Sequence, residues 1–519
     1  MSNSCTQLIG CLARAGLVLA LLSPAARAEA PLSIIDWLSE SVATPTALPN
    51  SALPGHPPTP GSETGIITVR PLGDIAPVSL GLISAQRAGL PKNLWGNSAS
   101  ADLARLLAEE APDTLPAVRN LLYSVLTAEL LPPVDGDGQS ALFLARVDKL
   151  LDLGALDTAL GLLEQLKDPA PEAFRRWFDV SLLLGHENYA CEVMDRSPDV
   201  APTFPARIFC LARLGDWNAA ALSLRTGRTL GTIDAEMADL LERFLDPDYS
   251  DGAPPLPPLS HLTPLSLRMM EAIGEPVPTA TLPLAFAQAD LRSNTGWKAR
   301  IEAGERLART GAIPPNRLLG LYSERKAAAS GGVWERVKAV QAFDTALRTS
   351  DPDQIGAKLR PVWEQMVGQE LEVPFATIYG PRLVALDLEG EAGALAFRIG
   401  LLSGDYEKAA HRHKASNREE AFLAGLATGS VGGTVPTDQL GVAVSAAFTE
   451  GALPDENAQR LLDEGKVGEA LLNAIAQVTE GARGDLRQIT SGLVLLRHIG
   501  MESVARRAAL ELTLLERRG

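Results

Sequence analysis

The sequence predicts an all-α protein in which antiparallel helix pairs stack into an α-solenoid. Three glycines, Gly154, Gly185 and Gly215, support this prediction because they recur at spacings of 31 and 30 residues. Each follows a leucine, has a phenylalanine eleven residues before it and an alanine five residues after it: Phe143, Phe174, Phe204 and Ala159, Ala190, Ala220. Matched positions at a near-constant period indicate a helical-repeat array, in which each helix pair needs a neighbour to bury its apolar face.

The first unit illustrates the physics. Residues 141–153 carry apolar side chains at helical spacing, which predicts one helix with one buried face. Gly154 then ends the helix, because glycine adopts the left-handed backbone that terminates helices without steric cost. A second helix is expected over residues 157–166, and the short connection makes the two helices antiparallel neighbours.

This pattern resembles the tetratricopeptide repeat, whose inter-helix turn carries a glycine and, five residues later, a small residue. The match is clearest in residues 214–220 and in residues 404–410, which contain Gly404 and Ala409. The same glycine–alanine signal recurs at Gly465 with Ala470 and at Gly500 with Ala505. The period here is shorter than the family's roughly 34 residues. The resemblance therefore implies a variant repeat of about 30–31 residues, and a looser helical solenoid is the alternative.

The resemblance also implies a concave groove lined by the first helix of each unit. Carried over by position, the residues on that side are Asp148, Asp152, Arg175, Asp179 and Arg213. Mixed charges of this kind suit a polar peptide or protein tail, and an ordinary solvated face is the competing interpretation.

The N-terminus has the pattern of a secretory signal peptide over residues 1–28: a short polar region, the apolar core 15–22 and a small-x-small site at residues 26–28. Removing its two arginines leaves 45 basic and 63 acidic side chains, a formal charge of −18. This charge argues against binding to nucleic acid or to an anionic membrane surface. We therefore expect an exported, periplasmic protein without a membrane span after signal cleavage.

A short amphipathic helix is expected over residues 29–42, with Ile34, Ile35, Trp37 and Leu38 as its apolar residues. Residues 43–65 contain six prolines and a single charge, a composition typical of a flexible linker. A hydrophobic motif on a tether is suited to bind a groove on a partner protein. The alternative is that the motif docks on its own chain.

The remaining chain divides by composition. We expect an N-terminal helical cap region with a short β-like segment (66–138), the repeats (139–250), a proline-rich loop or hinge (251–283) and a C-terminal helical repeat region (284–519). Helices are predicted over residues 100–110, 115–131, 284–291, 298–310, 316–329, 334–348 and 353–366.

Two cysteines, Cys191 and Cys210, remain after removal of the signal peptide. In an oxidising compartment such a pair tends to form a disulfide, here between neighbouring helix pairs, and two buried thiols are the alternative. The bridge would stabilise the fold by about 3 kcal/mol through loop closure.

No catalytic motif, cofactor-binding motif or metal-ligand spacing is recognisable, and the two close histidines, His411 and His413, are two apart and so point to different faces of a helix. We expect a scaffold or adaptor that binds protein partners in the cell envelope rather than an enzyme. One alternative is a superhelical accessory subunit or non-catalytic relative of a peptidoglycan-acting enzyme, similar to the body of some lytic transglycosylases. Another is an assembly factor or chaperone for an envelope or motility machine.

Overall fold

The structure is a computed structural model that describes residues 35–39, 77–136, 141–167, 169–197, 200–246 and 254–515. Within these ranges the regular secondary structure is helical, apart from two short strands, β1 and β2, which pair in parallel. The predicted signal peptide and the predicted linker, residues 1–28 and 43–65, lie outside the described residues. So does the short β-like segment of the predicted cap region, which we expect at residues 66–70.

The first half of the described chain runs from a short 3-10 helix to the end of the proline-rich segment. Its elements are η1 (Pro77–Ser79), β1 (Ile83–Ser84), α1 (Ala85–Ala88), α2 (Ser100–Glu109), α3 (Pro116–Thr127), β2 (Ala128–Glu129), α4 (Ala141–Asp152), α5 (Leu156–Leu163), α6 (Pro171–Leu184), α7 (Glu187–Arg196), α8 (Phe204–Arg213), α9 (Trp217–Leu230), α10 (Ala235–Leu245) and α12 (Pro264–Ala272).

The second half consists of helices joined by short connections. They are η3 (Leu284–Phe286), α13 (Ala287–Asp290), α14 (Trp297–Arg309), α15 (Pro315–Ser323), α16 (Val333–Thr349), α17 (Pro352–Val367), α18 (Glu372–Ala385), α19 (Gly390–Leu401), α20 (Tyr406–Arg412), α21 (Arg418–Thr428), α22 (Gln439–Ala447), α23 (Glu456–Asp463), α24 (Val467–Ala482), α25 (Leu486–His498) and α26 (Glu502–Leu514).

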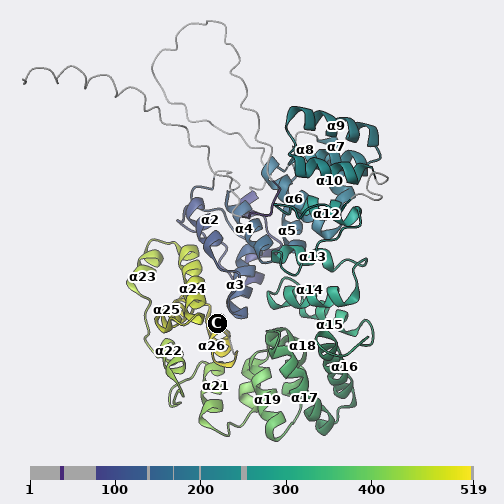
Figure 1. Cartoon of the computed structure of the whole chain (residues 1–519). Helices are drawn as coiled ribbons and strands as arrows, with labels where there is room; N and C mark the ends of the chain where they lie inside the picture. The colour runs from purple at the N-terminus through teal and green to yellow at the C-terminus, as the bar shows by residue number, and fades with distance from the viewer. Residues whose placement is uncertain are drawn as a thin grey trace, which may run out of the picture.

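The helices form a closed circuit (Figure 1). From α2–α4 the chain passes through α13–α19 to α21–α26, and α24 and α26 contact α3 while α24 also contacts α2. Polar contacts join the same two ends: the Ala117 N–H donates to Glu511 Oε2 at 2.8 Å, and the hydroxyls of Thr114 and Thr479 lie 2.6 Å apart. Helices from the two ends of the described chain are therefore packed side by side.

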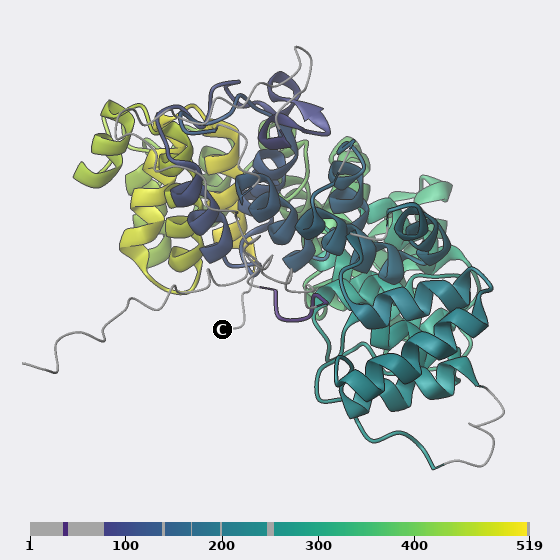
Figure 2. The same ribbon diagram turned by 90° about the horizontal axis from the view of Figure 1, so that it is seen from above.

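Helices α6–α10 form a lobe at one corner of this circuit (Figure 2). Helix α6 connects the lobe to the circuit, because it contacts α7 within the lobe and also contacts α5 and α12. Helix α12 lies within the predicted loop or hinge 251–283. That prediction gave weight to the prolines, but Pro264 occupies the first helical turn, where proline is tolerated, and the N-cap Thr263 forms a capping box with Ser266 in that turn.

The glycines of the repeat pattern lie between consecutive helices. Gly154 and Gly185 have φ values of 75° and 85°, so each reverses the chain in the left-handed region that favours glycine. Gly215, Gly465 and Gly500 also have positive φ, whereas Gly404 is not among the positive-φ glycines.

The other repeat-defining residues are mostly buried. Ala159, Ala190 and Ala220 are 0% exposed, Ala409 is 3% exposed, and Phe143 and Phe174 are 0% exposed, whereas Phe204 is partly buried. Buried alanines permit close approach of neighbouring helices.

A fully buried arginine ties the first elements together. Arg146 on α4 donates hydrogen bonds to the main-chain oxygens of Leu126, Val78 and Ala128, at 2.9, 3.0 and 3.1 Å. These carbonyls belong to the end of α3, to η1 and to β2. The guanidinium has five donors in a planar fork, and it thereby satisfies three buried acceptors that would otherwise destabilise the fold.

Candidate functional site

Residues 35–39 pack against the chain's own helices. The side chains of Trp37 and Leu38 are 7% and 3% exposed, and the Trp37 ring lies edge-on to Phe286 of η3 with ring centroids 5.5 Å apart. The segment is a turn, in which the Leu38 N–H donates to the Ile35 oxygen at 3.3 Å, rather than part of the predicted helix. Ile34 lies outside the described residues. The motif was expected either to bind a partner protein or to dock on its own chain, and its described residues dock on their own chain.

Ser39 is held by two charged side chains of α6. Its N–H and its hydroxyl donate to the two carboxylate oxygens of Asp179, at 2.8 and 2.7 Å, and Arg175 Nη1 donates to its carbonyl oxygen at 2.6 Å. We call this set of contacts, together with the Phe286 ring under Trp37, the Ser39 seat. In two of these hydrogen bonds Ser39 takes part through its main chain alone.

The charges expected on an open groove are therefore partly covered. Asp179 is 0% exposed and Arg175 is 5% exposed, and both hydrogen-bond to Ser39. Burial raises the pKa of Asp179 to about 6, although the hydrogen bonds from Ser39 and the charge of Arg175 oppose that rise. A buried carboxylate of this kind needs the partners that Ser39 supplies.

An ion pair links α4 and α6 next to the Ser39 seat. Arg176 donates through Nε and Nη2 to the two oxygens of Asp148, at 2.5 and 2.8 Å, and through Nη1 to Glu172 at 3.0 Å. The bidentate geometry suits a guanidinium and a carboxylate. Burial alone would lower the pKa of Arg176, but the hydrogen bonds and charges of Asp148 and Glu172 raise it above its usual value.

A cavity of about 720 Å³ adjoins residues 35–37. Four alanines of α2 and α4 are among its lining residues. Its wall continues with residues from the proline-rich segment. The lining residues are Ile35, Asp36, Trp37, Ala104, Arg105, Ala108, Glu109, Ala141, Ala145, Asp148, Lys149, Asp152, His261, Leu262, Leu282 and Pro283. A partly apolar cavity of this size with a few charged groups has the character of a ligand site.

Lys149 supplies a fixed positive charge to this cavity. Its Nζ donates to the main-chain oxygens of Ala108 and Glu110, at 3.3 and 2.7 Å, and to the Asp152 carboxylate at 2.9 Å. The Lys149 side chain is 4% exposed and that of Asp152 is 40% exposed. The carboxylate of Asp152 is thus the solvent-facing end of this group.

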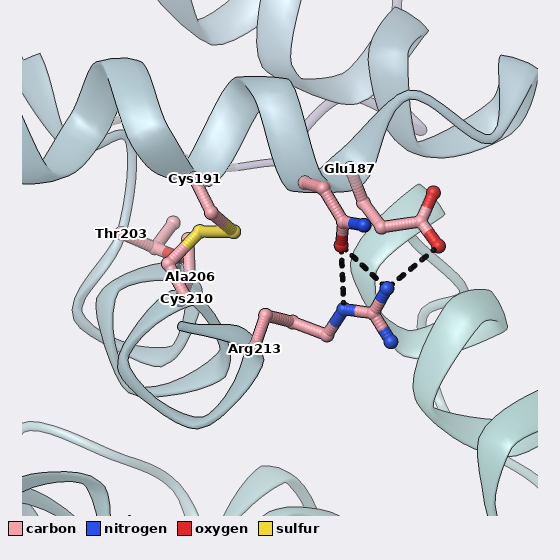
Figure 3. Close-up of a disulfide and its surroundings, with 7 residues drawn as sticks. Glu187, Cys191, Thr203, Ala206, Cys210 and Arg213 are labelled. Atoms are coloured by element: carbon pink, nitrogen blue, oxygen red, sulfur yellow. Dashed lines mark hydrogen bonds and ion pairs between the residues drawn. A yellow bond between two sulfur atoms is a disulfide. The ribbon is translucent and has the colours of Figure 1, made fainter. Parts of the chain in front are cut away.

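The structure brings four of the five predicted groove residues to one place. Asp148 and Asp152 line the cavity, and Arg175 and Asp179 lie beneath residues 37–39. Arg213 is elsewhere, in the lobe: it donates to the Asn188 side chain at 2.5 and 3.1 Å and lies 3.5 Å from Glu187 (Figure 3).

Cys191 and Cys210 form a disulfide between α7 and α8 (Figure 3). Their Cα atoms are 4.9 Å apart, within the usual range for a bridge. Both residues are buried, at 0% and 3% exposure. The bridge lies in the lobe, and it joins the second helix of one predicted unit to the first helix of the next.

Sequence reasoning missed the parts of the site that depend on distant contacts. Ser39 and Asp179 are 140 residues apart, and no local pattern links them. The roles of Phe286, Leu262 and Leu282 were also hidden, because they follow or lie within the proline-rich segment. The capping pair Thr263 and Ser266 was the one signal that could have indicated an ordered segment there.

Comparisons with protein-family models, with curated proteins and with solved structures give no match for this chain. Among the described residues, no helix is long and apolar enough to span a bilayer, and no three His, Cys, Asp or Glu side chains are grouped closely enough to bind a metal ion.

Proposed function

We propose that this chain is an exported scaffold or adaptor of the cell envelope that binds protein partners through a superhelix of tetratricopeptide-like helix pairs. Support for the architecture comes from the helical pairs that turn at Gly154, Gly185 and Gly215, each followed by a buried alanine. Support for export comes from the signal-like N-terminus and from the Cys191–Cys210 disulfide, which suits an oxidising compartment.

The observation that carries the proposal is the Ser39 seat. Main-chain hydrogen bonds to Arg175 and Asp179, with an aromatic contact to Phe286, are the means by which proteins bind short peptide segments. The adjoining cavity has room for further side chains of a bound segment. The function that fits this geometry is the capture of an unstructured stretch of a partner protein.

In-cell photo-crosslinking tests this function. A photoreactive amino acid replaces Glu109, whose side chain lines the cavity and is 59% exposed. The matched control replaces Arg348, whose side chain is 75% exposed on α16, remote from the cavity. We expect a discrete protein adduct from position 109 and none from position 348.

Identical adduct patterns from both positions would contradict the proposal. A parallel incubation of the purified mature protein with peptidoglycan addresses the enzymatic alternative. Release of soluble muropeptides in that incubation would show that the protein is an enzyme and would contradict the scaffold function.

A further inference from the structure

Charged side chains form a continuous row from the cavity to the Ser39 seat. Asp148 and Asp152 are four residues apart on α4, and Arg175 and Asp179 are four residues apart on α6, so each pair shares one helix face. Arg176 connects the two pairs through its bidentate contact with Asp148. The row combines three carboxylates, Asp148, Asp152 and Asp179, with the guanidiniums of Arg175 and Arg176, so a ligand chain that lies along it would meet charges of both signs.

Residues 37–39 occupy only one end of the row. Ser39 hydrogen-bonds to the buried Arg175 and Asp179, whereas Asp152 remains 40% exposed and the cavity beside Trp37 has a volume of about 720 Å³. The occupant is held by three hydrogen bonds and by burial of two side chains, Trp37 and Leu38. Main-chain hydrogen bonds combined with side chains placed in pockets are also the means by which folded domains hold bound peptides.

The chemistry of the seat defines what else can bind there. Arg175 and Asp179 bond to the main-chain oxygen and nitrogen of one residue, which any amino acid offers. The second Asp179 oxygen accepts a hydrogen bond from the Ser39 hydroxyl. Only serine and threonine carry a hydroxyl on a side chain this short. Two residues earlier, the contact with Phe286 requires an aromatic ring.

We propose that residues 37–39 are a displaceable intrachain occupant of the Ser39 seat. The functional ligand is a segment of a partner protein in which an aromatic residue stands two positions before a serine or threonine. This inference rests on the proposed function, because it specifies the partner chemistry and the regulation of the same site. Displacement opens the seat into the cavity, so that the partner segment follows the whole charged row.

An intrachain occupant weakens the apparent affinity of an external one. A tethered segment competes at an effective concentration of about millimolar. The apparent Kd of an external peptide is its intrinsic value divided by the fraction of chains with an empty seat. Weakening the intrachain contact therefore tightens binding of an external peptide, which is a signature that an ordinary structural contact lacks.

The test uses a fluorescent peptide with the sequence of residues 33–43 and the mature full chain. Fluorescence anisotropy measures its binding to the wild type, to Trp37→Ala and to Ser39→Ala. We expect Trp37→Ala to bind the peptide at least about tenfold more tightly than the wild type does, and Ser39→Ala to shift affinity in the same direction. Equal affinity for all three proteins, or no binding to any of them, would overturn the inference.

Two controls identify the seat. A peptide with alanine in place of tryptophan should lose binding to the Trp37→Ala chain. The variant Trp37→Ala/Asp179→Asn, with its fold verified by circular dichroism, should also bind the original peptide more weakly than Trp37→Ala does. Wild-type dimerisation that disappears in Trp37→Ala would assign the segment to a second copy of the chain and contradict displacement by a partner. The crosslinking experiment at Glu109 is independent of these outcomes, so failure of the peptide test leaves the binding function itself standing.

Discussion

Closure of the helical circuit depends on a carboxylate that caps a helix from the far end of the chain. Helix α3 begins after Leu115, a residue without a capping side chain, and its first turn contains the Ala117 N–H. Glu511 of α26 accepts from that N–H at 2.8 Å and is 5% exposed. Glu511→Ala removes this acceptor and leaves a buried donor without it, which costs about 1–3 kcal/mol in the free energy of unfolding.

Urea denaturation of the purified protein measures this cost. Glu511→Gln is the informative second variant, because its amide oxygen can still accept the hydrogen bond while the charge at the helix N-terminus is lost, at a smaller cost of about 0.3–1 kcal/mol. Glu480→Ala serves as the matched control, since that glutamate is 59% exposed on α24. A Glu511→Ala variant within about 0.5 kcal/mol of the wild type, the range of ordinary surface substitutions, would refute the role of this contact in closure.

The remaining predictions concern buried groups elsewhere. Cys191→Ser/Cys210→Ser should lower the free energy of unfolding by about 3 kcal/mol, and reductant should destabilise the wild type but not this variant in the same urea titration. Arg146→Met removes the guanidinium donor from three buried carbonyls, so we expect a loss of at least about 3 kcal/mol in thermal or urea unfolding; an unchanged midpoint would contradict that estimate. Burial raises the pKa of Glu110 to about 8, against the opposing charge of Lys149. Its contribution to stability is therefore fully present below pH ~4.5 and is lost as pH rises towards 8, and the difference between wild type and Glu110→Gln should follow this direction across a pH series.

Helices were predictable where their limits are set by neighbouring residues. The sequence predicts helices over residues 141–153 and 334–348, and the structure has α4 at Ala141–Asp152 and α16 at Val333–Thr349. In each case apolar spacing fixes the buried face, and Gly154 ends the first of the two. Such signals act within a few residues, so they survive without knowledge of the tertiary fold.

Burial of charged residues was not predictable in this way. A charge pattern on a helix assigns Arg175 and Asp179 to one face, but it does not reveal that a segment 140 residues away covers that face. The same limit applies to Glu511, which contacts Ala117 at a separation of 394 residues. Each of these contacts depends on the packing of elements that are distant in the chain, and helical periodicity contains no information about that packing.

Helix α6 connects the two parts of the molecule on which these inferences depend. Arg175 and Asp179 project from it into the Ser39 seat, and its C-terminal residue Leu184 leads through Gly185 into α7 of the lobe. The disulfide fixes α7 to α8 inside the lobe, whereas the contacts that close the circuit include the Ala117–Glu511 and Thr114–Thr479 hydrogen bonds and the packing of α24 and α26 against α3. The seat therefore lies on a helix that contacts both the disulfide-linked lobe and the rest of the circuit. A partner segment that replaced residues 37–39 would contact Arg175 and Asp179 of this helix and leave the cores of the lobe and the circuit unchanged.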